Sequence, residues 1–175
     1  MIFNLYGGPS AGKSTTAAYI FWRLKKERVS VELAQEYVKN WAYLKREPQG
    51  FDQVYIFGKQ LHSIDRLLYS GVDNVVTDSP IALGYIYARL YFPEIADPIM
   101  DIVKQFHRRN ETTEIYIDRK DRPYDQEGRF QDEENARAID EKVKRMLECY
   151  FPDTTHFVDY DDEGAIMKIV DDRRT

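Results

Sequence analysis

The stretch Gly7-Gly8-Pro9-Ser10-Ala11-Gly12-Lys13-Ser14 decides the fold of this chain. It follows the apolar run Ile2–Tyr6, which is typical of a buried parallel strand. After it, residues 14–27 (STTAAYIFWRLKKE) carry apolar side chains at helical spacing and end in lysines that suit the helix dipole. The sequence therefore predicts a strand, a glycine loop and a helix. In this arrangement, loop N–H groups and the helix N-terminus favour an anion.

The pattern G-x-x-x-x-G-K-[ST] of a phosphate-binding P-loop is met without a mismatch. Lys13 is expected to reach the β- and γ-phosphates of ATP, and the Ser14 hydroxyl to ligate Mg²⁺. A glycine-rich turn that fits by chance is the alternative, which the strand and helix around the loop disfavour. The residues expected to bind the nucleotide are Gly7, Gly8, Pro9, Ser10, Ala11, Gly12, Lys13, Ser14 and Thr15.

Length and composition indicate one soluble globular domain over residues 1–175. Hydrophobic residues make up 43% and charged residues 31% of the chain. A net charge of −5 argues against a generally basic nucleic-acid coat. The single cysteine, Cys149, favours a reducing cytosol, and no signal peptide or membrane span is evident. We therefore expect a cytoplasmic protein.

The rest of the chain alternates between strand and helix patterns. Further strands are predicted at 30–34, 74–78, 114–118 and 155–159, and further helices at 51–69, 81–90, 97–108, 132–149 and 163–171. This rhythm predicts an α/β P-loop NTPase fold, with a five-stranded parallel sheet, helices on both faces and ligands at the carboxyl ends of the strands.

Asp78 ends a predicted buried strand, where a second metal-coordinating acid belongs. Its carboxylate is expected to hold Mg²⁺ through water or to act on the attacking hydroxyl. Alternatively, Asp78 caps the helix that starts after Pro80, and both roles are compatible.

The polar segment 119–131 is either a mobile lid or a plain surface loop. As a lid, its Arg119, Arg122 and Arg129 are expected to close over the transferring phosphoryl group, with Arg129 the most important. As a surface loop, the same arginines pair with neighbouring acids of the segment.

The acceptor is expected to bind beside the second strand. Glu36 follows that strand directly and is well placed as a general base for a hydroxyl nucleophile. Lys39, Trp41 and Tyr55 are the predicted substrate contacts around it, and Gln60 is expected to read a base edge through its amide. The alternative is an amphipathic helix over 36–46 with its aromatic side chains in the core.

Four segments together resemble the phage-type P-loop kinase and ATPase family, which is similar to the kinase domain of the nicotinamide riboside kinases. They are GGPSAGKSTTA (7–17), VELAQEY (31–37), TDSP (77–80) and DQEGRFQDEENARAID (125–140). Some members of the family are linked to phosphorylation of 5-hydroxymethyluracil in phage DNA. The resemblance therefore implies a kinase, in a bacterial host's cytoplasm if the chain is phage-encoded.

A looser resemblance connects the chain with deoxynucleoside kinases. Residues 36–41 (EYVKNW) are similar to the E-P-V-x-x-W motif of that family, in which the glutamate is the base, with Tyr37 in place of the proline. The E-R-S motif of those kinases is matched by residues 78–80 (DSP), so that Ser79 stands where they have arginine.

Two functions remain open at this point. The first is an ATP-dependent kinase that phosphorylates a hydroxyl of a free nucleoside, a nucleotide or a hydroxymethyl base in DNA. The second is a regulatory or switch-type ATPase that binds a protein or nucleic acid. The identity of the acceptor, the preference for ATP over GTP and the oligomeric state are not legible in the sequence.

Overall fold

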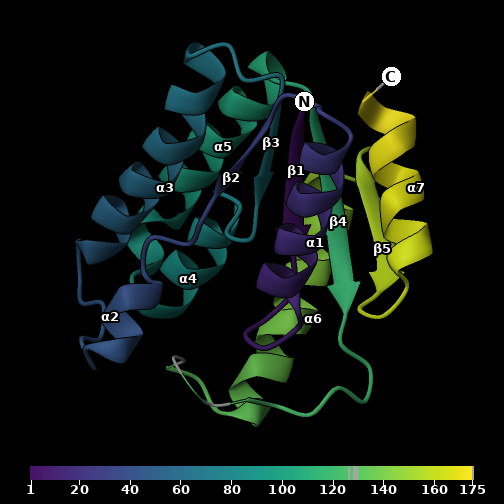
Figure 1. Ribbon diagram of the computed structural model, residues 1–175. Coiled ribbons are helices and arrows are strands. Elements are labelled where there is room, and N and C mark those ends of the chain that lie inside the picture. Colours follow the sequence, from purple (N-terminus) through teal and green to yellow (C-terminus); the bar gives the residue numbers. More distant parts are fainter. Residues whose placement is uncertain (126, 128–129, 175) are drawn as a thin grey trace.

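The computed structural model describes residues 1–125, 127 and 130–174. Within them, the strands are β1 (Ile2–Tyr6), β2 (Val31–Ala34), β3 (Asn74–Thr77), β4 (Thr112–Asp118) and β5 (Thr155–Asp159). They form one parallel sheet in the order β2-β3-β1-β4-β5. The predicted five-stranded parallel sheet is thereby confirmed, and the strand that leads into the glycine loop lies at its centre (Figure 1).

Each predicted helix is present, with bounds that differ from the prediction by at most three residues. The helices are α1 (Lys13–Lys26), α2 (Lys39–Tyr43), α3 (Asp52–Tyr69), α4 (Leu83–Tyr91), the 3-10 turn η1 (Pro93–Ile95), α5 (Ala96–Arg109), α6 (Glu133–Tyr150) and α7 (Glu163–Arg174). The short helix α2 occupies only the middle of the segment 36–46.

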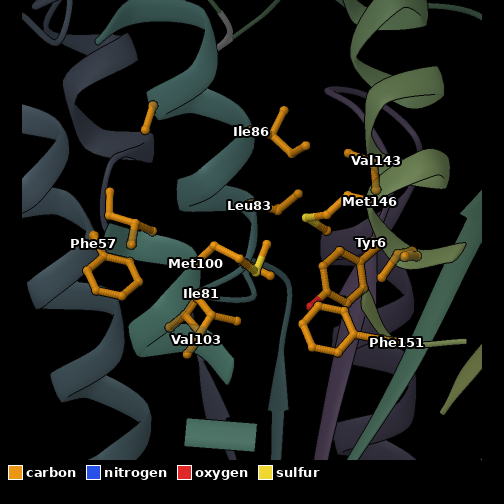
Figure 2. Packing of buried hydrophobic residues seen from close by; sticks show 14 of the residues in the cluster. Tyr6, Phe57, Ile81, Leu83, Ile86, Met100, Val103, Val143, Met146 and Phe151 are labelled. Atoms are coloured by element: carbon orange, nitrogen blue, oxygen red, sulfur yellow. The ribbon is translucent and has the colours of Figure 1, made fainter. Parts of the chain in front are cut away.

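Alternate residues of β1 feed two hydrophobic cores, one on each face of the sheet. Phe3 and Leu5 pack with the buried side of α1 and α7. Ile2 and Tyr6 pack with α3, α4, α5 and α6. In Figure 1, α1 and α6 accordingly lie on opposite sides of the strands. Figure 2 shows Tyr6 of the second core beside side chains of α6 and its end.

Helix α6 starts at a well-defined cap. The side chain of Asp132 accepts a hydrogen bond of 2.8 Å from the backbone N–H of Asn135, and Glu133 and Glu134 occupy the first turn. A capping carboxylate and two acids at the positive end of the helix dipole stabilise this start. The start of α6, which follows the segment after β4, is therefore fixed at Asp132.

None of the helices in the described part of the chain is both long enough and apolar enough to cross a membrane.

Candidate active site

The glycine loop connects β1 to α1 at the carboxyl edge of the sheet, between the two strands that flank β1. Gly7 and Gly12 have φ angles of 139° and 101°, in the region that disfavours any side chain. At Gly7, an added Cβ would also lie 2.8 Å from the Cβ of Ala11 and 3.1 Å from the carbonyl oxygen of Ile117. These two glycines are therefore required by the shape of the loop.

The side chain of Lys13 folds back over the loop. Its Nζ donates hydrogen bonds of 2.8 Å to the carbonyl oxygens of Gly7 and of Gly8. Burial lowers the pKa of Lys13, and the carboxylates of Glu36 and Asp78 act in the opposite direction. A half-buried cation is thus held where the predicted phosphates would lie.

Asp78 joins the phosphate loop to the segment after β2. Its Oδ2 accepts a hydrogen bond of 2.6 Å from Ser14 Oγ, and its Oδ1 accepts one of 3.1 Å from the backbone N–H of Glu36. Helix α4 begins only at Leu83 and has no side-chain cap. The structure therefore places Asp78 beside Ser14 and not at a helix start.

The Ser14 and Asp78 pair fits Mg²⁺, because hydroxyl and carboxylate oxygens are the ligands that this ion prefers. Among the described residues, no cluster of three or more His, Cys, Asp or Glu could hold a metal ion. Mg²⁺ usually takes one or two protein oxygens and completes its shell with water and phosphate.

A cavity of about 530 Å³ opens from the phosphate loop toward α2, α3 and α4. That volume is in the range of small-molecule sites. Its lining residues are Pro9, Ser10, Ala11, Gly12, Lys13, Ser14, Thr15, Glu36, Val38, Lys39, Ala42, Glu47, Pro48, Gln53, Ile56, Tyr87, Tyr91, Arg122, Asp125, Phe130 and Gln131. The cavity thus combines most of the expected nucleotide contacts with the expected base, Glu36.

Glu36 and Lys39 both line this cavity, and their roles as base and substrate contact stay predictions. Glu36 is half-buried, and its charge acts on Lys13 and on the hydroxyl of Tyr87. Burial is the main reason why the pKa of Tyr87 is raised, and the carboxylate of Glu36 raises it further. Tyr87 therefore keeps its proton and presents a neutral hydroxyl on the same cavity lining as Glu36.

Trp41, Tyr55 and Gln60 are not among the described residues that line the cavity, so their contact with the substrate stays a prediction. Trp41 is buried and stacks on Tyr55, with ring centroids 6.4 Å apart, beside a separate shallow groove. Gln60 is buried, and its amide accepts a hydrogen bond from the Tyr37 N–H and donates one to Thr77 Oγ1. Within residues 36–46, Trp41 is buried, as the alternative foresaw, whereas Tyr43 is exposed.

The sequence reasoning missed Gln53, Tyr87 and Tyr91. The side chain of Gln53 is only 6% exposed, lines the cavity and makes no hydrogen bond among the described residues. It lies seven positions before Gln60, on the same face of α3, so the helical period could have found it. The rings of Tyr87 and Tyr91 stack at 6.5 Å and 5°, as an i, i+4 pair of α4.

The segment between β4 and α6 approaches the phosphate loop through Arg122 and Asp125. Arg122 lies against Gly12, its guanidinium 5.2 Å from the centre of the Tyr160 ring, and the backbone N–H of Asp125 donates to Ser10 Oγ at 3.1 Å. Arg129 lies outside the described residues.

Arg119 departs from the prediction. It is only 4% exposed, does not line the cavity, and pairs with Asp140 of α6 at 2.6 Å between Nε and Oδ2. Arg119 directly follows β4, and its guanidinium lies next to Gly8 of the phosphate loop. It is therefore part of the packed interior rather than of a lid.

A parallel sheet, a glycine loop with its lysine and a Ser–Asp pair beside the next strand define a P-loop nucleotide-binding protein. A family model described as an AAA domain matches residues 2–157, and the chain belongs to this family. The comparison with curated proteins gives no match.

Solved structures share the fold at low sequence identity. NadR in complex with NR superposes with a TM-score of 0.70 at 20% identity, over 99% of this chain and 50% of that one. A deoxyadenosine kinase from M. mycoides, with the products dCMP and a flexible dCDP, gives 0.61 at 15% identity, over 98% and 97%. The same kinase with dATP gives 0.59 at 15% identity, over 98% of each chain. At these identities the comparison establishes the fold, and the chain spans half the length of NadR.

Proposed function

We propose that the protein is an ATP-dependent kinase that transfers the γ-phosphoryl group to a hydroxyl of a nucleoside-like acceptor. One observation carries the proposal: a single cavity joins the phosphate loop to a wall that holds the carboxylate of Glu36 and the amide of Gln53. A nucleotide switch needs the first part of that cavity but not the second. The kinase fold of the solved neighbours agrees with this proposal.

The donor half binds the triphosphate through the loop amides and Lys13, whose ammonium group neutralises the β- and γ-phosphates. Mg²⁺, held through Ser14 and Asp78, supplies further charge neutralisation when bound. Arg122 lies at the far end of the loop, where its guanidinium reaches the same charge.

In the transfer step, the acceptor oxygen forms a bond with the γ-phosphorus while the bond from that phosphorus to the bridging oxygen breaks. ADP leaves with the electron pair of the broken bond. Glu36 takes the proton of the acceptor hydroxyl, for which a half-buried carboxylate on the cavity wall is suited.

The acceptor half favours a flat, neutral or cationic group. Tyr87 and Tyr91 offer ring surface, Gln53 offers one donor and one acceptor side by side, and Glu36 and Glu47 add negative charge. Among the described lining residues, Lys13 and Arg122 are the cations on the phosphate-loop side, and Lys39 lies near Glu36. Because Glu36 and Glu47 outweigh this one lysine, a neutral nucleoside suits the wall better than a nucleoside monophosphate.

A 5-hydroxymethyl pyrimidine in DNA is the finer acceptor that the family resemblance implies. Its hydroxymethyl group would have to reach Glu36 from an extruded or unpaired base. The same cavity serves a free nucleoside and such a base, so the two are separated by experiment.

The test incubates the protein with γ-labelled ATP and separate acceptors: nucleosides, monophosphates, nicotinamide riboside, plain DNA and hydroxymethylated DNA. We expect label in a nucleoside-type acceptor, in amounts equal to the ADP formed. ADP formation with no labelled acceptor in any reaction would refute the kinase and favour the switch-type ATPase.

A further inference from the structure

A buried ion pair lies directly behind the phosphate loop. Arg119, which follows β4, and Asp140, on α6, are 4% and 6% exposed. Asp140 uses one oxygen, Oδ2, for the guanidinium at 2.6 Å and the other, Oδ1, to accept the backbone N–H of Gly8 at 2.5 Å. One carboxylate thus connects the loop to an element more than a hundred residues away in sequence.

The backbone of α6 approaches Gly8 so closely that no side chain fits between them. A Cβ on Gly8 would lie 2.6 Å from the carbonyl oxygen of Ala136 and 2.9 Å from Nη2 of Arg119. Ala136 and Asp140 are four residues apart and share one face of α6. The contact is therefore built from a glycine on one side and a helix face on the other.

The ion pair is poorly explained as a stabilising feature of the core. Buried pairs usually gain little over apolar residues of similar volume, because both charges lose their hydration. A lone carboxylate behind the loop would also repel phosphate, and Arg119 cancels that charge. What the pair supplies beyond packing is an oriented acceptor for one backbone N–H.

Gly8, whose N–H Asp140 accepts, also contacts the lysine that is expected to bind the phosphates. The carbonyl of Gly8 accepts a hydrogen bond from Lys13 Nζ at 2.8 Å, and the carbonyl of Arg119 accepts one from the N–H of Arg122 at 2.9 Å. A shift of Gly8 would therefore change the place of Lys13. A shift of Arg119 would change that of Arg122.

We propose that Asp140 is a positioning residue, which fixes the Gly8 amide and thereby holds the phosphate loop in the shape that receives a nucleoside triphosphate. Arg119 pairs with that carboxylate and offsets its negative charge toward the phosphates. The inference rests on the proposed function only in taking a triphosphate as the ligand.

The experiment compares two double variants in which no buried charge is left unpaired. Asp140→Leu with Arg119→Met removes the acceptor for Gly8, whereas Asp140→Asn with Arg119→Met keeps an acceptor oxygen at the same place. Calorimetry measures the dissociation constant for MgATP, without any acceptor. Thermal unfolding establishes that both variants are folded, and Glu141→Leu, at the exposed neighbour on α6, is the control.

The leucine variant should bind MgATP about tenfold more weakly or worse, since the loop must be ordered on binding. The asparagine variant and the control should remain within about twofold of the unmodified protein. Equal affinity in the two folded double variants would overturn the positioning role. Because no acceptor takes part, a wrong acceptor assignment leaves this result unchanged.

A second measurement needs no variant. Amide hydrogen exchange at Gly8, followed by NMR in the unmodified protein, should be slow because the N–H is buried and bonded to Asp140. Exchange at Gly8 as fast as at exposed loop amides would overturn the proposal even if the double variants fail to fold.

Discussion

Replacing Glu114 by Gln should change how the stability of the protein depends on pH. Glu114 lies on β4, fully buried, with His107 Nδ1 3.8 Å from its Oε1. Burial raises the pKa of Glu114 from 4.5 to about 7 and lowers the pKa of His107 from 6.5 to about 4. Each group is thus disfavoured in its charged form inside the fold.

The two groups act on stability in opposite directions. The folded protein keeps the proton of Glu114 longer than the unfolded chain, so its contribution is complete below pH 4.5 and is lost as the pH rises through 7. The contribution of His107 is complete above pH 6.5 and is lost as the pH falls through 4. Their slopes oppose each other between pH 4.5 and 6.5, which hides both in the unmodified protein.

The difference in stability between Glu114→Gln and the unmodified protein isolates the carboxyl group, because His107 is common to both. A pKa difference of this size corresponds to about 3 kcal/mol. The variant should therefore gain about 3 kcal/mol relative to the unmodified protein as the pH rises from 4.5 to 7.

The assay is urea denaturation at several pH values between 4 and 8, with equal denaturant slopes as the check that two-state analysis applies. Glu111→Gln, at an exposed acid three residues earlier, is the control and should give a constant difference. A constant difference for Glu114→Gln as well would show that Glu114 is already ionised in the folded protein, and would refute the reasoning.

Three further predictions concern the cavity. Lys13→Ala should abolish MgATP binding or turnover, since the cation at the phosphates is lost; calorimetry would show it, and turnover at the normal rate would contradict it. Glu36→Gln should slow transfer about 10²-fold or more with ATP affinity almost intact, whereas Glu94→Gln, at an exposed carboxylate outside the cavity, should remain near normal. Arg122→Ala should lower kcat more than the affinity for ATP in single-turnover assays, and an effect on affinity alone would make it a simple phosphate clamp.

The sequence predicted those parts of the fold that are determined by local sequence rather than by tertiary contacts. The glycine loop is set by local backbone angles at Gly7 and Gly12, and the acids at 132–134 mark the start of α6. The central strand β1 is a short, mainly apolar run, as a parallel strand covered on both faces requires. The pairing of Ser14 with Asp78 was also within reach, because the carboxyl ends of adjacent parallel strands meet at one edge.

The site predictions that the described cavity does not include concern side chains whose direction is decided by packing. Gln60 and Gln53 are chemically identical and lie on the same face of α3, but Gln60 sits against Thr77 of the sheet while Gln53 reaches the cavity. Arg119 has the charge expected of a lid residue, and only the fold brings Asp140 to it. No local pattern distinguishes these environments.

This difference explains why the sequence predicts the phosphate-loop side of the cavity but not the side proposed to bind the acceptor. The phosphate loop is one continuous stretch, and backbone amides and a single lysine recognise a ligand with fixed chemistry. The acceptor wall is assembled from the segment after β2 and from α2, α3 and α4, each contributing one or two side chains. A change in the angle of α3 would replace Gln53 by another residue without changing any motif. The identity of the proposed acceptor therefore depends on how these helices pack on the sheet, and a search for it should begin there.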